Sequence, residues 1–425
     1  MINYITTIAE PTEENIARAG RIVKEGGLVA FPTETVYGLG GDALNPASSE
    51  KIYAAKGRPS DNPLIVHICE LSALYEIAEE VPEEALVLAD RFWPGPLTMI
   101  FKKKSLVPRE TTGGLETVAV RMPDNRTALE LIRAAGGFIA APSANLSGKP
   151  SPTTAKRVFE DMDGRIELIL DGGRSVIGLE STIVDLTGEE VPMILRPGYV
   201  SDQMIREAVG AVFYDPAVFG TESGRLAAHN GDAGKGGTSD AQAGFVPATL
   251  RVDNGEPATN LRPKAPGMRY RHYAPQGELS IVCGGAEEVC AAISELCREN
   301  SERGKKCGVI AFEESVPLYL RQLFPREEKE GNWADTNCPR EFFGNGFKGC
   351  KNEKFCVINI GSKEEEGQIA GALYESLRFC DDEGIGEIFA EELWSGEKNL
   401  SQAIANRLLK AAGGKLIYAG RREER

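Results

Sequence analysis

Residues 28–40 read LVAFPTETVYGLG and join a short apolar run to a polar segment. The run 28–31 is entirely apolar and ends at Pro32, which is typical of a buried strand. Two threonines, a glutamate and a tyrosine follow the end of that strand. Ligands usually bind at strand ends in α/β sheets, so the segment predicts either part of a binding site or a polar turn whose hydroxyls cap the next helix.

Helical and strand-like patterns alternate around this segment and predict an α/β domain over about 1–212. The expected helices are 13–26, 46–56, 71–79, 82–93, 125–135 and 153–161. The expected strands are 28–31, 64–68, 97–101, 118–121, 138–141, 166–170, 182–186 and 194–196.

The organisation changes after this domain. Residues 220–244 contain seven glycines and a single large aliphatic residue, Leu226, so they cannot bury enough apolar surface to fold and predict a linker. Periodicity then returns with strands at 279–283, 307–312 and 355–360 and helices at 286–300, 366–382 and 400–412. This pattern predicts a second, smaller α/β domain with a parallel sheet, interrupted by a surface loop at 326–353.

Composition excludes several classes of protein. The 425 residues include 48 Lys and Arg against 63 Asp and Glu, a net charge of −15 that gives no bulk attraction for nucleic acid or anionic membranes. No stretch reaches the roughly 18 apolar residues of a spanning helix. The first residues show no basic segment before an apolar one, which argues against a secretory signal. Nine cysteines without a dense repeating spacing favour reduced thiols inside a cell.

The segment 56–63, KGRPSDNP, carries Lys56 and Arg58 in a loop bounded by prolines. Lysine as a point charge and arginine as a fork can converge on a polyanion, whereas two solvated surface cations are the ordinary alternative. His67 ends the next strand-like run, where a buried histidine bonded to a backbone carbonyl is the alternative to a site residue. Three histidines in the chain leave little material for metal or triad chemistry.

A third polar segment, AAPSANLSGKPSPT at 140–153, leaves another strand and precedes a helix. Its backbone amides, Ser143 and Asn145 are suited to phosphate or ribose, although the segment matches neither of the two common phosphate-binding motifs. Arg121, Ser181 and Arg196 also stand at strand ends. Together these cations and hydroxyls predict a small anionic ligand at one edge of the sheet.

The ordered series of segments resembles the threonylcarbamoyl-AMP synthase family in its long two-domain form. Over about 10–212 the resemblance rests on PTETVYGLG at 32–40, KGRP at 56–59, NPL at 62–64, His67, WPGPLT at 93–98, TVAVRMP at 117–123, APSANLSGKPSPT at 141–153, STIVD at 181–185 and LRPG at 195–198. The linker carries PGMRYRHYAP at 266–275, and 276–420 resembles the family's C-terminal domain.

This resemblance implies an α/β protein with a defined domain plan. A twisted, open, mixed sheet of the YrdC-like type would form the catalytic domain at 1–212. A linker at 213–275 would carry a motif that closes the site, and a smaller Rossmann-like domain would follow at 276–425. The insertion at 326–353 and the long glycine-rich stretch at 220–262 depart from the compact family plan.

The resemblance also implies a reaction. L-Threonine, bicarbonate or CO2, and ATP would give threonylcarbamoyl-adenylate, pyrophosphate and water, making the chain a nucleotidyltransferase. Mg²⁺ would be held mainly through the ATP phosphates rather than by a protein metal site. The product would serve a partner machinery in the cytoplasm that makes threonylcarbamoyladenosine in tRNA.

Site residues follow from the matching motifs. Threonine would be held by Thr35, His67, Arg121, Ala141 and Ser181. ATP would be held by Arg58, Asn62, Thr117, Ser143, Asn145, Ser151, Arg196 and the linker residue Tyr270, with Tyr273 as the alternative tyrosine. Lys56 and Arg58 would be catalytic because they can neutralise the phosphates.

Two other functions are compatible with parts of the chain. A nucleic-acid-binding module would use a concave basic surface, but the acidic composition and the lack of a basic stripe with interleaved aromatics disfavour it as the main function. A carbamoyl-transfer enzyme of hydrogenase maturation shares the N-terminal motifs, yet it would add acylphosphatase and zinc-finger regions that nothing here matches.

Overall fold

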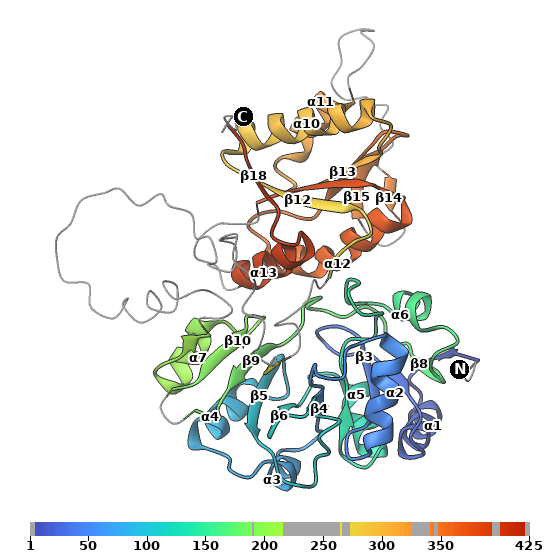
Figure 1. Ribbon diagram of the computed structural model, residues 1–425, viewed down its shortest axis with the longest axis vertical. Coiled ribbons are helices and arrows are strands. Elements are labelled where there is room, and N and C mark those ends of the chain that lie inside the picture. The colour runs from blue at the N-terminus through green and yellow to red at the C-terminus, as the bar shows by residue number, and fades with distance from the viewer. Residues whose placement is uncertain are drawn as a thin grey trace, which may run out of the picture. The chain divides into compact units, whose positions relative to one another are not determined.

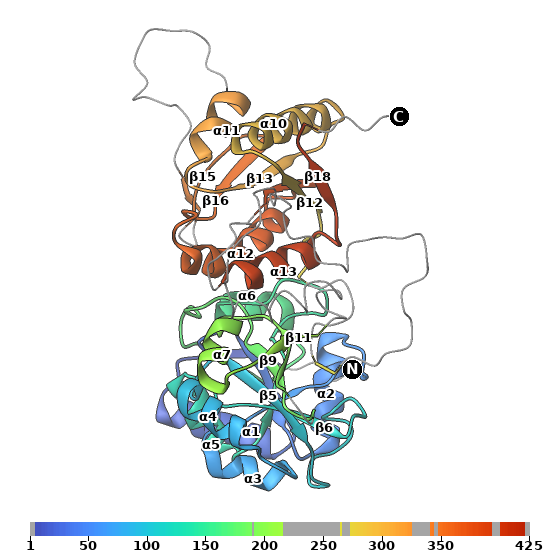
Figure 2. The same cartoon turned by 90° about the vertical axis from the view of Figure 1, so that its left-hand side faces the viewer.

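The computed structural model describes residues 5–188, 191–215, 264–265, 273–324, 341–343, 347–392 and 400–420. They fall into two compact units (Figures 1 and 2). The first unit comprises Met1–Ser147, Thr154–Ser175 and Glu180–Tyr270, and the second comprises Gly148–Thr153, Val176–Leu179 and Arg271–Arg425. Within the described ranges, no helix has the length and apolar character needed to cross a membrane.

The first unit is built on an open, mixed, eleven-stranded sheet with the order β1-β8-β2-β3-β7-β4-β6-β5-β9-β10-β11. Its strands are β1 (Thr7–Ala9), β2 (Val29–Phe31), β3 (Gly38–Asp42), β4 (Ile65–His67), β5 (Leu97–Lys102), β6 (Thr117–Arg121), β7 (Ile139–Ala140), β8 (Leu168–Leu170), β9 (Thr182–Asp185), β10 (Met193–Arg196) and β11 (Phe213–Tyr214). The strand β4 runs parallel to β6, whereas β5 runs antiparallel to β6 and parallel to β9. The expected α/β class and mixed sheet are confirmed.

Helices connect and cover these strands. They are α1 (Glu13–Lys24), α2 (Pro46–Lys56), α3 (Leu74–Ile77), α4 (Glu83–Phe92), α5 (Arg126–Ala134), α6 (Ala155–Met162) and α7 (Asp202–Val209), with a short 3₁₀ turn at Leu71–Ala73. The sequence predicted the first six positions but not α7.

The glycines of β3 stand in a strand that the sequence did not predict. Gly38 and Gly40 lie in the strand, where β3 pairs antiparallel with β2. A Cβ on Gly40 would come within 2.8 Å of Ile139 and 2.9 Å of Phe31, so these glycines make room for a close approach of neighbouring side chains.

The two faces of the central strands bury different residues. Side chains of one parity enter the large core of the unit: Val66, Met99, Val118, Val120 and Val184. Side chains of the other parity form a smaller apolar cluster: Ile65, Ile100, Ala119 and Ile183, joined by Leu195 and by Ala265 of the linker. This second side of β4, β6, β5, β9 and β10 is called the site face below. Next to Ala265, Lys264 pairs with Asp185 at 3.2 Å, so both residues of this short described segment lie on the site face.

The second unit is built on a seven-stranded sheet with the order β14-β15-β16-β13-β17-β12-β18. Its strands are β12 (Glu278–Cys283), β13 (Cys307–Ala311), β14 (Glu341–Phe343), β15 (Phe347–Lys351), β16 (Phe355–Asn359), β17 (Glu387–Glu391) and β18 (Leu416–Tyr418). Two helices lie on each face of the sheet (Figures 1 and 2): α10 (Ala286–Glu302) and α11 (Val316–Leu323) on one, α12 (Glu366–Asp382) and α13 (Ser401–Ala411) on the other.

Two expectations for the second unit are corrected. The sheet is parallel from β16 to β18, but β14 and β15 pair antiparallel with each other, and β15 pairs antiparallel with β16. Part of the insertion at 326–353 therefore extends the sheet instead of forming only a surface loop. Cys350 is disulfide-bonded although reduced thiols were expected, whereas Cys283 and Cys356 are among the free cysteines.

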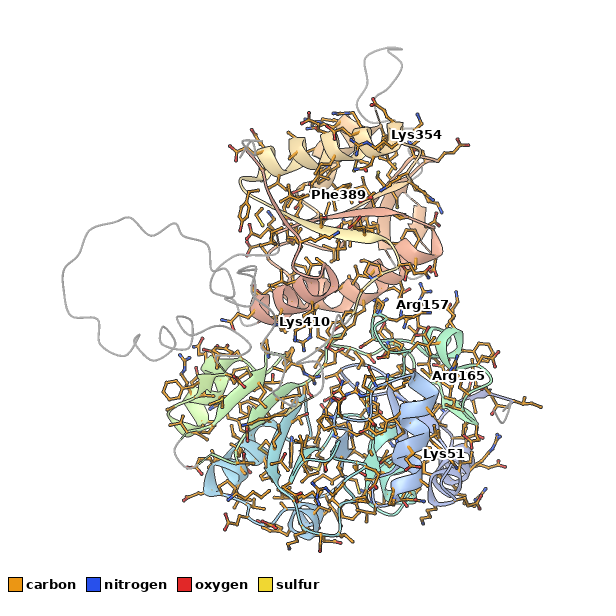
Figure 3. The ribbon with its side chains drawn as sticks, viewed as in Figure 1. Lys51, Arg157, Arg165, Lys354, Phe389 and Lys410 are labelled. Carbon is orange, nitrogen blue, oxygen red and sulfur yellow. The ribbon has the colours of Figure 1, made fainter. Side chains whose placement is uncertain are left out.

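Packing within the second unit combines an apolar core with buried polar contacts. Phe389 of β17 lies in the core (Figure 3) and is 3% exposed. Arg378 of α12 donates from Nε and Nη2 to the carbonyl oxygen of Pro150, at 3.1 and 2.6 Å. These two bonds explain why the segment Gly148–Thr153 groups with this unit.

Candidate active site

The end of α2 sets the position of two predicted catalytic cations. Asn45 caps the start of the helix by accepting the N–H of Ala47 at 3.0 Å, and Gly57 ends it in the left-handed conformation, with φ of 61°. The N–H of Arg58 then donates to the carbonyl oxygen of Tyr53 at 2.9 Å, so the chain turns back on the helix. This turn holds Lys56 and Arg58 close together.

Lys56 is almost fully buried, at 2% exposed, and connects α2 to the loop after β7. Its ammonium group donates to the carbonyl oxygens of Ser143 and Asn145, the latter at 2.6 Å. The N–H of Ser147 returns a bond to the carbonyl oxygen of Lys56 at 2.9 Å. The structure therefore brings together three residues predicted to bind ATP or its phosphates.

Arg58 is held by backbone oxygens near the start of β4. Its Nε donates to the carbonyl oxygen of Asn62 at 3.3 Å, and its Nη2 donates to that of Pro63 at 3.2 Å. Directly after the neighbouring strand β7, the N–H of Ala141 donates to the carbonyl oxygen of Ile65 at 2.9 Å. Lys56, Arg58 and the Ser143 loop thus surround the beginning of β4, which is called the nucleotide end of the site.

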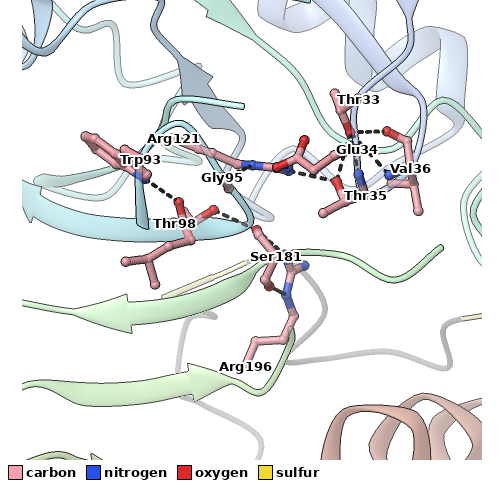
Figure 4. A network of polar contacts seen from close by, with 11 residues as sticks. Thr33, Glu34, Thr35, Val36, Trp93, Gly95, Thr98, Arg121, Ser181 and Arg196 are labelled. Atoms are coloured by element: carbon pink, nitrogen blue, oxygen red, sulfur yellow. Dashed lines mark hydrogen bonds and ion pairs between the residues drawn. The ribbon is translucent and has the colours of Figure 1, made fainter. Parts of the chain in front are cut away.

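Arg121 ends β6 and forms the centre of a polar network drawn in Figure 4. Its Nη1 donates to Oγ1 of Thr35 at 2.9 Å, and its Nε donates to the carbonyl oxygen of Gly95 at 3.2 Å. Its Nη2 lies 2.6 Å from Oε1 of Glu34. The guanidinium group is only 5% exposed as a side chain, so this is a buried charge with directed partners.

His67 lies beside Arg121, because the two residues pair in register between β4 and β6. Its Nδ1 is 3.1 Å from the carbonyl oxygen of Ile65, which is the backbone contact of an ordinary buried histidine. Burial, reinforced by the charge of Arg121, lowers the pKa of His67 to about 3. The imidazole is therefore neutral at physiological pH and can offer a hydrogen bond but no charge.

Ser181 and Arg196 form a second part of the network in Figure 4. A register shift in β10 between Ile194 and Arg196 turns the arginine toward the start of β9. There Nε of Arg196 donates to the carbonyl oxygen of Ser181 at 3.0 Å, and Nη2 donates to its Oγ at 3.1 Å. The same hydroxyl is 2.7 Å from Oγ1 of Thr98. Arg196, predicted to bind ATP, thus lies with predicted threonine ligands.

These residues share the site face. His67, Arg121 and Ser181 stand two residues from Ile65, Ala119 and Ile183 respectively, and Thr98 stands two residues from Ile100, so all four have the parity of the site face. Because β4 and β6 are parallel and β5 and β9 run the other way, they gather at one end of that face. This is called the threonine end. The side chains project from a face, whereas the sequence predicted an edge.

Of the three remaining predicted ATP ligands, the structure describes Thr117 and Ser151. Thr117 begins β6, so at about 3.3 Å per residue it lies roughly 13 Å from Arg121, toward the nucleotide end. Ser151 is 1% exposed and belongs to the segment that groups with the second unit. Tyr270 lies outside the described residues. The alternative tyrosine, Tyr273, stacks on Tyr374 with ring centroids 5.1 Å apart.

One residue of the network was not among the predicted site residues. Glu34 stands between Thr33 and Thr35 in the segment 28–40. It was assigned no role from the sequence, because a carboxylate is not expected to bind an anion. A signal was present, since Arg121 and Glu34 belong to two motifs assigned to one site.

Among the described residues, no group of three or more His, Cys, Asp or Glu is placed to hold a metal ion.

Two family models match different parts of the chain. Residues 21–198 match the Sua5, YciO and YrdC family model described as "Telomere recombination", and residues 237–413 match the one described as "Threonylcarbamoyl-AMP synthase, C-terminal domain". A threonylcarbamoyl-AMP synthase of Pyrococcus abyssi is 41% identical over 98% of this chain and 99% of its own length. One from Bacillus subtilis is 39% identical over 97% of both chains.

A solved structure matches over the same length. The chain resembles the crystal structure of P. abyssi Sua5 complexed with L-threonine, with a TM-score of 0.73 and 40% identity over 98% of this chain and 99% of that one. A double alanine variant of the same Sua5 protein gives a TM-score of 0.74 at 38% identity, covering 99% and 100%. The chain therefore belongs to the threonylcarbamoyl-AMP synthase family.

Proposed function

We propose that this chain is an L-threonylcarbamoyladenylate synthase, which forms threonylcarbamoyl-AMP and pyrophosphate from L-threonine, bicarbonate or CO2, and ATP. The observation that carries the proposal is the arrangement of four buried cations, with Arg121 and Arg196 at the threonine end and Lys56 and Arg58 at the nucleotide end. Full-length relatives that bear the name of this enzyme support it.

The threonine end suits a small amino acid. We propose that the carboxylate of threonine binds the guanidinium group of Arg121, since a guanidinium fork matches a carboxylate in shape and charge. Neutral His67 and the hydroxyls of Thr35 and Ser181 would offer hydrogen bonds to the polar groups of the substrate, and Ala141 would contribute its backbone. The complex of P. abyssi Sua5 with L-threonine supports this assignment.

The nucleotide end suits a triphosphate. Lys56 and Arg58 would neutralise the phosphates, while Asn62, Thr117, Ser143, Asn145 and Ser151, together with Arg196 from the threonine end, would contact the rest of ATP. Mg²⁺ would enter with ATP on the phosphate oxygens and supply further positive charge to the leaving pyrophosphate. The chain needs no general base at this step, because its cations act by orienting the phosphates and stabilising their charge.

The chemistry follows from this arrangement. The carbamate of threonine is already anionic, so one of its oxygens can attack the α-phosphorus as the bond to pyrophosphate breaks. Both the carbamate and the mixed anhydride are labile in water, which makes burial useful. Lys56, Arg58, Arg121 and Arg196 are each at most 9% exposed, so the reacting groups would meet in a dry environment.

The wider role is proposed from the family. Catalysis would reside in 1–212, with the linker at 213–275 closing the site through Tyr270 and a C-terminal domain at 276–425. The product would pass in the cytoplasm to the machinery that makes threonylcarbamoyladenosine in tRNA.

Pyrophosphate release tests the reaction. The purified chain is incubated with ATP, Mg²⁺, bicarbonate and L-threonine, and each substrate is omitted in turn. We expect pyrophosphate release only when ATP, Mg²⁺, bicarbonate and L-threonine are all present. L-Serine and L-valine replace L-threonine in parallel reactions to test the amino-acid specificity. Release that does not depend on threonine would refute the assignment.

A further inference from the structure

Glu34 forms a buried ion pair with the residue that should bind the substrate carboxylate. Its Oε1 lies 2.6 Å from Nη2 of Arg121, and the side chains of Glu34 and Arg121 are 9% and 5% exposed. Figure 4 shows the carboxylate directed at the guanidinium group, next to Thr35. The acidic partner of Arg121 in the described structure is therefore a side chain of the protein.

The turn that carries Glu34 is fixed by its neighbour. The hydroxyl of Thr33 accepts the N–H groups of Thr35 and Val36, both at 3.2 Å, and donates to the carbonyl oxygen of Val36 at 2.6 Å. These bonds hold the backbone on both sides of Glu34, so its side chain can change rotamer without unfolding the turn.

The ion pair is not reinforced by hydrogen bonds. Neither carboxylate oxygen of Glu34 accepts a hydrogen bond with good geometry from any described residue, and Nη2 of Arg121 donates none. A buried carboxylate without hydrogen-bond donors loses much of its hydration energy and recovers only the attraction to one cation. Such a contact is easier to exchange than a fully bonded salt bridge.

We propose that Glu34 is an internal mimic of the substrate, occupying the carboxylate position on Arg121 until threonine displaces it. The inference rests on the proposed function, in which the threonine carboxylate binds Arg121. Thr35 and Gly95 already take the Nη1 and Nε donors of Arg121, so the two carboxylates compete for the side of the guanidinium group that carries Nη2.

The role of such a mimic follows from charge. Without a ligand, Glu34 keeps Arg121 neutralised and oriented in a buried place. With threonine bound, the substrate carboxylate takes over this function and Glu34 moves away. The affinity for threonine is then lower than it would be without Glu34, because Arg121 must separate from Glu34 before it can bind the substrate carboxylate.

Glu34→Gln tests the displacement. The variant keeps the shape of the side chain but removes the charge that competes for Arg121. We expect the Kd of L-threonine, measured by calorimetry on the full chain, to fall at least about fivefold, because the competing state loses its attraction. In turnover, the KM for threonine should fall while kcat changes less.

A probe and a control make the test specific. L-Threoninamide lacks the carboxylate and should bind Glu34→Gln and the parent chain with equal Kd. Glu167→Gln is the matched control, since Glu167 is a carboxylate of the same unit that accepts the N–H of Leu28 at 2.9 Å, away from Arg121. It should leave the Kd of threonine unchanged.

The outcomes separate this inference from the proposed function. A parent chain that binds no threonine would refute the function itself. A parent chain that binds threonine, with a folded Glu34→Gln variant whose Kd is equal or higher, would overturn only the displacement. If Glu34→Gln does not fold, Glu34→Asp carries the test, because a side chain shorter by one methylene reaches Arg121 less well and should also tighten threonine binding.

Discussion

Lys56 and Arg121, at the two ends of the site, are held in different ways. At the nucleotide end, Lys56 donates to the carbonyl oxygens of Ser143 and Asn145. At the threonine end, Arg121 is paired with the carboxylate of Glu34 at 2.6 Å. Carbonyl oxygens orient an ammonium group without cancelling its charge, whereas a carboxylate neutralises its partner.

This difference matches the ligands proposed for each end. A triphosphate brings several negative charges and benefits from cations that are oriented in advance. Threonine brings one carboxylate, and a protein carboxylate can stand in its place until it arrives. Under the proposed function, one end thus receives a polyanion and the other exchanges a single anion.

The largest effect is expected when the threonine end loses its cation. Arg121→Ala removes the partner of the substrate carboxylate and leaves Glu34 buried without its ion pair, so kcat/KM for threonine should fall by about 10²–10³-fold or more. Steady-state pyrophosphate release measures it. Arg91→Ala, at an exposed ion pair with Glu207, is the control and should keep full activity. Near-normal activity of Arg121→Ala would remove Arg121 from the site.

A large effect on ATP is expected at the nucleotide end. Lys56→Ala removes both a charge and the bonds that hold the loop of Ser143 and Asn145, so the KM for ATP should rise by about tenfold or more and kcat should fall. Lys51→Ala is the control on the same helix (Figure 3), since Lys51 donates to the carbonyl oxygen of Gly26 at 2.6 Å. A variant that changed only the threonine KM would contradict the division into two ends.

A smaller effect is expected from the hydroxyl of Ser181. Ser181→Ala leaves Nη2 of Arg196 and Oγ1 of Thr98 without their shared partner, a loss of about 1–2 kcal/mol. The KM for threonine should rise by roughly five- to thirtyfold, with a normal circular dichroism spectrum. Ser181→Thr, which keeps a hydroxyl, should recover part of the loss.

The smallest effect on activity is expected from the ionisation of His67. Its pKa of about 3 in the folded chain lies below the unfolded value of 6.5, so the unfolded chain takes up the proton first as pH falls. Stability from this group is therefore complete above pH 6.5 and is lost toward pH 3, by up to about 1.4 kcal/mol per pH unit. The free energy of unfolding of the parent chain and of His67→Gln is measured by urea unfolding at several pH values. Between pH 6.5 and pH 3 it should fall less steeply with pH in the variant.

The pH–rate profile gives a second check on His67. Between pH 5 and 8 it should contain no ionisation that disappears in His67→Gln, because the imidazole is already neutral. An ionisation near pH 6.5 that the substitution abolishes would show that the histidine changes charge during the reaction.

The sequence predicted most of the elements that carry the site but not how they meet. Short apolar runs such as 64–68 and 118–121 predicted β4 and β6, because a run of branched apolar side chains is typical of a buried strand. The strand β3 was not predicted, because its sequence GLGGD has few side chains and shows no strand pattern. The reason for its glycines is the close approach of Phe31, which is seen only in the structure. The hairpin of β14 and β15 was hidden in a charged insertion.

The site shows the same limit. Motifs named Arg121, Ser181 and Lys56 individually, but the parity that places His67, Thr98 and Arg121 on one face depends on strand register, which is set by long-range pairing. The role of Glu34 depends on a contact between residues 87 positions apart in the chain, and such a contact has no local signature.

In the proposed reaction, one site joins threonine and ATP through a carbamate. The most direct test is to supply ¹³C-bicarbonate with L-threonine, ATP and Mg²⁺, quench the reaction and analyse the adenylates by mass spectrometry. We predict threonylcarbamoyl-AMP that carries one ¹³C atom and is lost in Arg121→Ala. An unlabelled threonyl-adenylate, or ADP as the sole nucleotide product, would contradict the account.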